Sequence, residues 1–113
     1  MAASGSAIRV LVVDDSALVR EGLRAVLGTH GKFYQIDVVG DADSVAAAAN
    51  QTRRLKPDVV LLDIRLPDGS GLDACREILR LHPAARVLIL TSVASDELIH
   101  QAVMAGAQGY LMK

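Results

Sequence analysis

The sequence is poor in cysteine and in aromatic residues, which often stabilise small proteins through disulfides and core packing. It contains one cysteine, one phenylalanine, two tyrosines and no tryptophan in 113 residues. The lone Cys75 excludes an intramolecular disulfide and suits a reducing compartment, so we expect a cytoplasmic protein. The longest apolar runs, such as 59–62 and 87–90, are too short to cross a bilayer, and no membrane segment is predicted. The opening "MAASGSA" lacks the features of a signal peptide, so residues 1–7 are expected to form a disordered lead-in.

The sequence also lacks an excess of either charge. It carries 12 basic and 13 acidic residues, a formal net charge of −1, and no long run of like charge. Nucleic-acid-binding domains usually show a basic stripe, so we expect no DNA binding by these residues themselves. With 51% apolar residues, the chain has the size and composition of one compact domain with its own core.

Short apolar runs predict the strands of a parallel sheet. Residues 8–13, 36–39, 58–62 and 86–91 are rich in Val, Ile and Leu, and three of the four runs are nearly continuously apolar. Continuous runs suit strands that are covered on both faces. Residues 109–112 form a weaker fifth candidate.

Helical spacing fills the segments between these runs, at 16–29, 44–54, 70–81 and 95–105. In the first helix, Val19, Leu23, Val26 and Leu27 draw one apolar stripe. The segment 70–81 begins with "SGLD", which predicts a helix cap with a return bond from the aspartate. The alternation of strands and helices predicts an α/β fold with a doubly wound sheet and helices on both faces.

The predicted strands end in residues that suit a ligand site. Asp14 and Asp15 follow the first strand, Asp63 the third, Thr91 ends the fourth, and Lys113 follows the fifth. In open α/β sheets the ligand lies beyond the carboxyl ends of the strands, where we expect these side chains to meet.

Three carboxylates in one small volume repel each other unless a cation joins them, and hard oxygen ligands suit Mg²⁺ or Mn²⁺. Thr91 and Lys113 would bind phosphoryl oxygens, and Asp63 would act as the nucleophile toward phosphorus. Simpler interpretations remain for single residues: Asp14 and Asp15 as helix caps, Thr91 as a plain strand residue, Lys113 as a frayed end.

Several other polar residues receive ordinary interpretations. Cys75 is expected to be a small buried hydrophobe, and Asp41 and Asp43 are expected to be turn or cap residues. Leu18 lies off the stripe of its helix and should be partly exposed. The histidines show no metal-ligand spacing and are expected in solvent: His30, His82 and His100.

Four motifs together resemble one known family. They are "VVDDS" (12–16), "LLDIRLPDGSGLDACREI" (61–78), "LILTS" (88–92) and "GAQGYLMK" (106–113). In these motifs the chain resembles the receiver domain of two-component response regulators over residues 8–113. The resemblance implies a flavodoxin-like fold with a five-stranded sheet in the order 2-1-3-4-5 and a switch more than an enzyme, limited to self-phosphorylation and slow self-dephosphorylation.

The resemblance also implies roles for single residues. Asp63 would be the phosphoacceptor, Asp15 a direct Mg²⁺ ligand, Asp14 a ligand largely through water, and the Arg65 backbone carbonyl a further ligand. The matching phosphate-sensing pair is Thr91 and Lys113, and Tyr110 matches the switching aromatic, although it would also suit a plain core position.

"DIRLPDGSG" and "GAQGYLMK" further resemble the NarL/FixJ class, which carries a LuxR-type helix-turn-helix. Complete members continue with a fifth helix and a DNA-binding domain, whereas this sequence stops at Lys113. We therefore expect no fifth helix here, DNA binding only through an absent C-terminal domain, and more self-association than in a longer chain. The expected partners are a sensor histidine kinase, docking at Leu18 and Gly22 by hypothesis, and a second copy in a homodimer.

Three rival functions remain open at this point. A haloacid-dehalogenase-type phosphatase also uses a strand-end aspartate and Mg²⁺, but needs an acid two residues later, where Arg65 stands. A flavin-binding module needs a phosphate loop after the first strand, where "DDSALVR" would repel phosphate. The third rival is a receiver fold that serves only as an interaction module.

Overall fold

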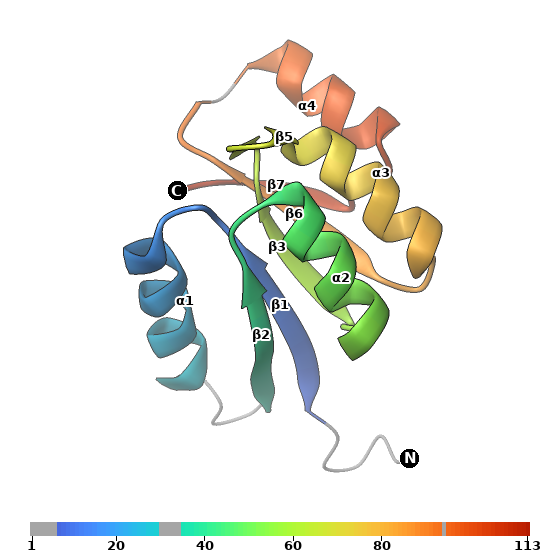
Figure 1. The fold of residues 1–113 in the computed structure, drawn as a ribbon. Coiled ribbons are helices and arrows are strands. Elements are labelled where there is room, and N and C mark those ends of the chain that lie inside the picture. The colour runs from blue at the N-terminus through green and yellow to red at the C-terminus, as the bar shows by residue number, and fades with distance from the viewer. Residues whose placement is uncertain (1–6, 30–34, 94) are drawn as a thin grey trace.

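Five parallel strands form one sheet with helices on both of its faces (Figure 1). The computed structural model describes residues 7–29, 35–93 and 95–113. The strands pair in the order β2-β1-β3-β6-β7, which is 2-1-3-4-5 when they are counted along the chain. Their bounds are Ile8–Val13 (β1), Ile36–Ala42 (β2), Val59–Asp63 (β3), Arg86–Thr91 (β6) and Gly109–Met112 (β7). The predicted fold class is confirmed, while residues 1–6 of the expected lead-in lie outside the described residues.

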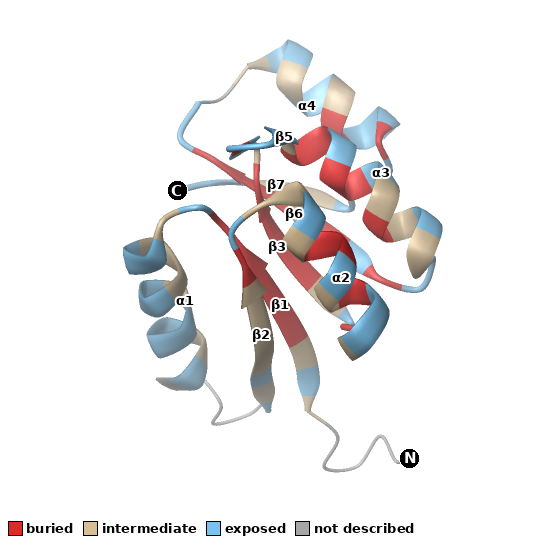
Figure 2. Ribbon diagram, viewed as in Figure 1, coloured by how far each residue is buried: buried red, intermediate tan, exposed pale blue. Residues whose placement is uncertain are grey.

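Alternate strand residues build two apolar layers, one on each face of the sheet. The larger layer joins β1, β3 and β6 to three helices, α2 (Val45–Leu55), α3 (Gly71–Leu81) and α4 (Asp96–Met104). The smaller layer, which includes Val10 and Val12, packs against Leu23 and Leu27 of α1 (Ala17–Thr29). Strands that are buried on both sides need apolar residues at successive positions, which explains the continuous runs in the sequence. Figure 2 shows this burial concentrated in the central strands and the facing sides of α2 and α3.

Four helices flank the sheet in the described part of the chain, as the sequence predicted. Of the helices that the structure describes, α1 alone lies on one face of the sheet, beside β1 and β2, while the other three share the opposite face (Figure 1). Leu111 and Met112 in β7 are 48% and 55% exposed. None of the described helices has the length and apolarity needed to span a bilayer.

Local caps set where the helices begin and end. Ser44, Ser70 and Ser95 each place a hydroxyl at a helix start, where it accepts a bond from a backbone N–H two or three residues later. α2 ends at Leu55, because Lys56 adopts a left-handed φ of 50° and Pro57 cannot continue the helix.

The structure differs from the sequence-based expectations in a few local details. A short antiparallel hairpin, β4 (Arg65–Leu66) with β5 (Gly69–Ser70), lies between β3 and α3 and was not predicted. Asp73 forms an ion pair with Arg76 at 3.1 Å in place of the expected return bond to the helix cap. Val26 lies at the edge of the α1 stripe and is 54% exposed.

Candidate functional site at the carboxyl edge of the sheet

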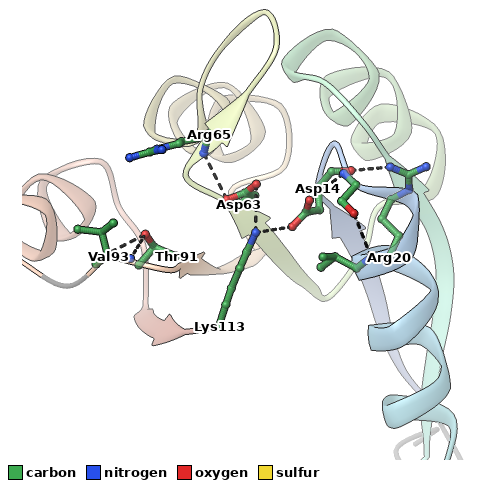
Figure 3. A network of polar contacts seen from close by, with 9 residues as sticks. Asp14, Arg20, Asp63, Arg65, Thr91, Val93 and Lys113 are labelled. Carbon is green, nitrogen blue, oxygen red and sulfur yellow. Dashed lines mark hydrogen bonds and ion pairs between the residues drawn. The ribbon is translucent and has the colours of Figure 1, made fainter.

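Four strands deliver polar side chains to the edge formed by their carboxyl ends (Figure 3). Asp14 follows β1, Asp63 ends β3, Thr91 ends β6 and Lys113 follows β7. β1 pairs with β3, β3 with β6, and β6 with β7, all in parallel. Because parallel strands end at the same edge, residues far apart in the chain come together there.

Three carboxylates converge at this edge. One oxygen from each of Asp14, Asp15 and Asp63 lies within 4.8 Å of the others. Asp14 is 1% exposed and Asp63 6% exposed, whereas Asp15 faces solvent. Like charges this close destabilise one another, and hard oxygen donors favour Mg²⁺, Mn²⁺ or Ca²⁺ over softer metals. This donor set therefore fits a hard divalent cation.

Lys113 brings a positive charge into the same cluster. Its Nζ lies 2.8 Å from Asp14 Oδ2 and 3.3 Å from Asp63 Oδ2. Burial, the largest single influence, lowers the pKa of Lys113, but the hydrogen bond to Asp14 and the charges of Asp63 and Asp14 together outweigh it. The net effect is a raised pKa, so the ammonium stays charged beside the carboxylates.

Asp63 borders an open cleft. The Arg65 backbone N–H donates to Asp63 Oδ1 at 3.3 Å, while the Arg65 side chain extends away from the carboxylate (Figure 3). The cleft has a volume of about 290 Å³, and its walls come from the acids, the hairpin and the ends of β6 and β7: Asp15, Asp63, Ile64, Arg65, Leu66, Pro67, Ser92 and Lys113. A small anion that enters the cleft would reach Asp63 and Lys113 together.

Gly71 permits the tight return of the chain behind Asp63. Its N–H donates to the Ile64 carbonyl at 2.8 Å. A Cβ at this position would lie 2.1 Å from the Asp63 carbonyl oxygen, which no side chain tolerates. The second glycine of "DGSG" is therefore required by the close approach of two backbone segments.

Thr91 and Tyr110 meet at the backbone of Val93. The Thr91 hydroxyl accepts from the Val93 N–H at 3.1 Å and donates to the Val93 carbonyl at 3.2 Å, and the Tyr110 hydroxyl donates to the same carbonyl. Thr91 is 1% exposed, and Figure 3 shows its hydroxyl turned toward Val93. Within the described residues, the Thr91 hydroxyl shares no hydrogen bond with Asp63 or with the Lys113 side chain, although the Thr91 carbonyl accepts from the Lys113 backbone N–H at 2.8 Å.

Two other residues singled out from the sequence lie on the exposed surface of α1. Leu18 is 79% exposed, as expected from its place off the apolar stripe. Gly22 is also exposed, with open space where a Cβ would stand. Neither residue contributes to the lining of the cleft.

Cys75 and two of the histidines can be compared with expectation. Cys75 is fully buried, as predicted, and burial raises the pKa of its thiol to about 11 against the smaller opposing charge of Arg76. The prediction for His82 is wrong: it is half-buried, and its Nε2 lies 2.9 Å from the Pro57 carbonyl oxygen. His100 is exposed as predicted, and His30 lies outside the described residues.

Asp41 is not a turn or cap residue. It lies within β2, and its Oδ2 is 3.6 Å from Arg20 Nε and 3.5 Å from Arg24 Nη2. The strand extends farther than its apolar run because the last residues pair with β1. Asp43 lies in the bend before α2, as expected.

Two residues that brace the site were missed in the sequence. Arg20 donates from Nη1 to the Asp14 carbonyl at 2.6 Å. Asp68 in the hairpin accepts from the backbone N–H groups of Val45 and Ala46, at 2.7 and 3.1 Å. The short spacing between Asp14 and Arg20 was a weak local signal for the Arg20 contact. The Asp68 contacts join residues that are 22 and 23 positions apart, so no local pattern in the sequence predicts them.

Comparison with known proteins gives a consistent result. The model of the response regulator receiver domain matches residues 10–113. The DNA-binding transcriptional activator DevR/DosR of Mycobacterium tuberculosis is 47% identical over 106 residues, which cover 94% of this chain and 48% of that protein. The chain thus spans about half the length of this relative and of the response regulator GacA of Pseudomonas viridiflava, which is 43% identical over 106 residues.

Solved structures agree with this match. A LuxR-family two-component response regulator from Aurantimonas sp. superimposes with a TM-score of 0.87 at 35% identity, over 96% of this chain and 75% of that chain. A response regulator from Burkholderia pseudomallei, solved with a phosphorylated aspartic acid and a calcium ion, gives 0.80 at 31% identity, over 93% and 59%. The chain belongs to the response regulator receiver domains, a family of phosphorylation-dependent signalling domains, and matches its NarL/FixJ-like members.

Proposed function

We propose that this chain is a phosphorylation switch in which Asp63 accepts a phosphoryl group from a phosphohistidine of a sensor histidine kinase. The arrangement of Lys113 carries the proposal, because its Nζ lies 3.3 Å from Asp63 at the border of an open cleft. A nearly buried carboxylate beside a fixed ammonium offers both a nucleophile and a counter-charge for phosphoryl oxygens.

The chemistry is a direct transfer to a carboxylate oxygen. An oxygen of Asp63 attacks phosphorus, the P–O bond forms as the P–N bond to the kinase imidazole breaks, and the imidazole leaves with the electron pair and takes up a proton from solvent. Lys113 is close enough to Asp63 to bind a phosphoryl oxygen as negative charge concentrates there.

The acidic cluster would hold Mg²⁺, or Mn²⁺ in its place. The expected ligands are Asp63, Asp15, Asp14 largely through water, and the Arg65 backbone carbonyl. When bound, such an ion supplies positive charge that neutralises phosphoryl oxygens. The calcium ion and phosphorylated aspartic acid in the Burkholderia pseudomallei regulator support a hard divalent cation in this role.

The Thr91 hydroxyl is proposed to sense the new phosphate. A phosphoryl group on Asp63 offers strong acceptors, and Thr91 would bind one of them only by leaving the Val93 backbone. Tyr110 bonds to the same Val93 carbonyl, so its position would change with that of Thr91. Phosphorylation would thereby shift an existing equilibrium between two surfaces around β7.

The surrounding protein is proposed from the relatives. DevR/DosR is a DNA-binding transcriptional activator of about twice this length. We propose that residues 8–113 form the receiver domain of a cytoplasmic regulator, with a LuxR-type DNA-binding domain after them. Transcription control would be its output and a homodimer its active form. Leu18, exposed on α1 with Gly22, is the proposed docking point for the kinase.

The direct test is incubation with acetyl phosphate and Mg²⁺, followed by intact-mass measurement. We expect one phosphoryl adduct of about 80 Da on the natural chain and none on Asp63→Asn, because the amide cannot act as the nucleophile. Asp58→Asn, which changes an exposed aspartate near the opposite ends of the strands, is the matched control and should keep the adduct. An adduct that persists in Asp63→Asn contradicts the proposal, and steady hydrolysis of a phosphate ester without an adduct favours the phosphatase.

A further inference from the structure

The Arg20 side chain extends from α1 to the turn that carries Asp14 and Asp15. It comes from the beginning of α1 and is only 18% exposed. Its Nη1 donates to the backbone carbonyl of Asp14 at 2.6 Å (Figure 3). A charged donor on a carbonyl is a strong hydrogen bond, particularly where water has little access.

Asp14 is held at several points, and among the described residues Arg20 makes the only side-chain hydrogen bond to its backbone. The Asp14 N–H donates to Ala42 at 3.0 Å, and its carboxylate accepts from the Ser16 N–H at 2.9 Å and from Lys113 at 2.8 Å. Without Arg20 the Asp14 carbonyl would lose its charged donor, and the peptide that joins Asp14 to Asp15 would be less constrained. A change in the backbone torsion angles on either side of that peptide would alter how the two carboxylates are oriented relative to each other.

Another donor of the guanidinium, the buried Nε, lacks a hydrogen bond. Arg20 Nε is buried without a hydrogen-bond partner, and the nearest carboxylate oxygen, on Asp41, is 3.6 Å away. A buried N–H without a bond is costly and calls for an explanation. The geometry favours the bond to the Asp14 carbonyl over an ideal pair with Asp41.

We propose that Arg20 is a positioning residue, which holds the Asp14–Asp15 turn so that its carboxylates converge on Asp63 and thereby raises the affinity of the cluster for a divalent cation. This inference rests on the proposed function, in which the cluster takes such a cation. Arg20 itself touches neither the cation nor the phosphoryl group.

The sign of the effect separates positioning from simple electrostatics. Arg20 is a positive charge near a cation site, so its removal by charge alone would strengthen cation binding. Loss of positioning would weaken binding, because residues that orient metal ligands typically contribute about tenfold or more to affinity. In a variant that is still folded, a weaker site after removal of a nearby positive charge therefore indicates lost geometry.

The test compares Arg20→Gln with Arg24→Gln, using Mn²⁺ binding measured by electron paramagnetic resonance. Arg24 makes the same type of contact with Asp41, at 3.5 Å, but donates to the Val38 carbonyl and not to Asp14. We expect about tenfold weaker Mn²⁺ binding in Arg20→Gln and a change within about twofold in Arg24→Gln. The rate of phosphorylation by acetyl phosphate should recover in Arg20→Gln as Mg²⁺ is raised to saturation.

Thermal unfolding establishes that each variant is folded, and Arg20→Lys serves as a second variant. Lysine keeps one charged donor but lacks the planar fork, so binding should fall between the natural chain and Arg20→Gln. Unchanged or tighter Mn²⁺ binding in folded Arg20→Gln overturns the inference and leaves the proposed function intact. If Arg20→Gln does not fold, natural affinity in Arg20→Lys overturns it. A natural chain that neither binds Mn²⁺ nor forms the adduct overturns the proposed function and this inference with it.

Discussion

At the residue scale, Lys113 balances the negative charge of the cleft. Its Nζ is closer to Asp14, at 2.8 Å, than to Asp63, at 3.3 Å. The ammonium therefore neutralises part of the carboxylate charge that a divalent cation would neutralise in the proposed mechanism. An incoming cation and the Lys113 ammonium compete for the Asp14 carboxylate, and their mutual repulsion weakens the interaction of each with the carboxylates.

Replacing Lys113 should therefore strengthen cation binding in the unphosphorylated protein. Two unit positive charges about 4 Å apart repel by about 1 kcal/mol even in bulk water, and the divalent Mg²⁺ is repelled more, so Lys113→Met should bind Mg²⁺ at least about fivefold more tightly. Isothermal titration calorimetry measures this change. Arg86→Met removes an equal charge from an exposed position at the start of β6 and should change the affinity little. Weaker binding in Lys113→Met would contradict the idea of competition.

At the element scale, the start of α2 is tied to the hairpin that follows β3. The backbone N–H groups of its first turn all have partners: two bond to Asp68 of the hairpin and two to Ser44. Free N–H groups at the start of a helix attract carboxylates. Here the carboxylate belongs to Asp68, which lies 22 residues after Ala46 in the chain. The hairpin thereby gains a rigid support, and it is the same hairpin that lines the cleft with Arg65.

Asp68→Asn should destabilise the fold in a pH-dependent way. The N–H groups of Val45 and then Ala46 lower the pKa of Asp68. A lowered pKa in the folded state stabilises the fold above the unfolded value of about 3.9, and this contribution disappears as pH falls through the folded value. The free energy of unfolding in urea should therefore differ between natural chain and variant at pH 5 to 7, and the difference should shrink below about pH 4.

The control for this prediction is Asp43→Asn. Asp43 is an exposed carboxylate in the bend before the same helix. Its replacement should have a much smaller effect on the free energy of unfolding at every pH. A stability difference for Asp68→Asn that stays constant from pH 3 to 7 would refute the role assigned to its carboxylate.

At the scale of the whole molecule, the lone thiol reports on the integrity of the core. Cys75 is fully buried within the larger apolar layer, and its Sγ lies 3.5 Å from the Ala105 carbonyl oxygen. Burial raises the pKa of this thiol to about 11. The thiolate is the reactive form of cysteine, so the raised pKa and the lack of solvent access both protect Cys75 from alkylation in the folded protein.

Alkylation of Cys75 by iodoacetamide at pH 8 should therefore be at least about 100-fold slower in the folded protein than in concentrated urea. A pKa of about 11 leaves only about one thiol in a thousand ionised at that pH, against roughly a quarter for a free cysteine. Mass spectrometry over time measures the rate. Rates within tenfold of each other would indicate that α3 and α4 do not seal the core.

The sequence predicted the main elements and the residues at the strand ends because both depend on regular patterns. Continuous apolar runs mark strands that are buried on two faces, and parallel strands carry their last residues to one edge. The pattern alone therefore predicts that Asp14, Asp63 and Lys113 lie together at one edge of the sheet. The motif resemblance supplied the strand order, which the observed sheet confirms.

Only the tertiary structure decided which partner each of these side chains takes. It directed Thr91 and Tyr110 to the Val93 carbonyl, brought Lys113 nearer to Asp14 than to Asp63, and joined Asp68 to α2. Periodicity specifies which face or edge a residue occupies, but a hydrogen bond depends on rotamers and on distances of a few tenths of an ångström. Those are determined by the packing of segments that are distant in the chain, so no local pattern in the sequence encodes them.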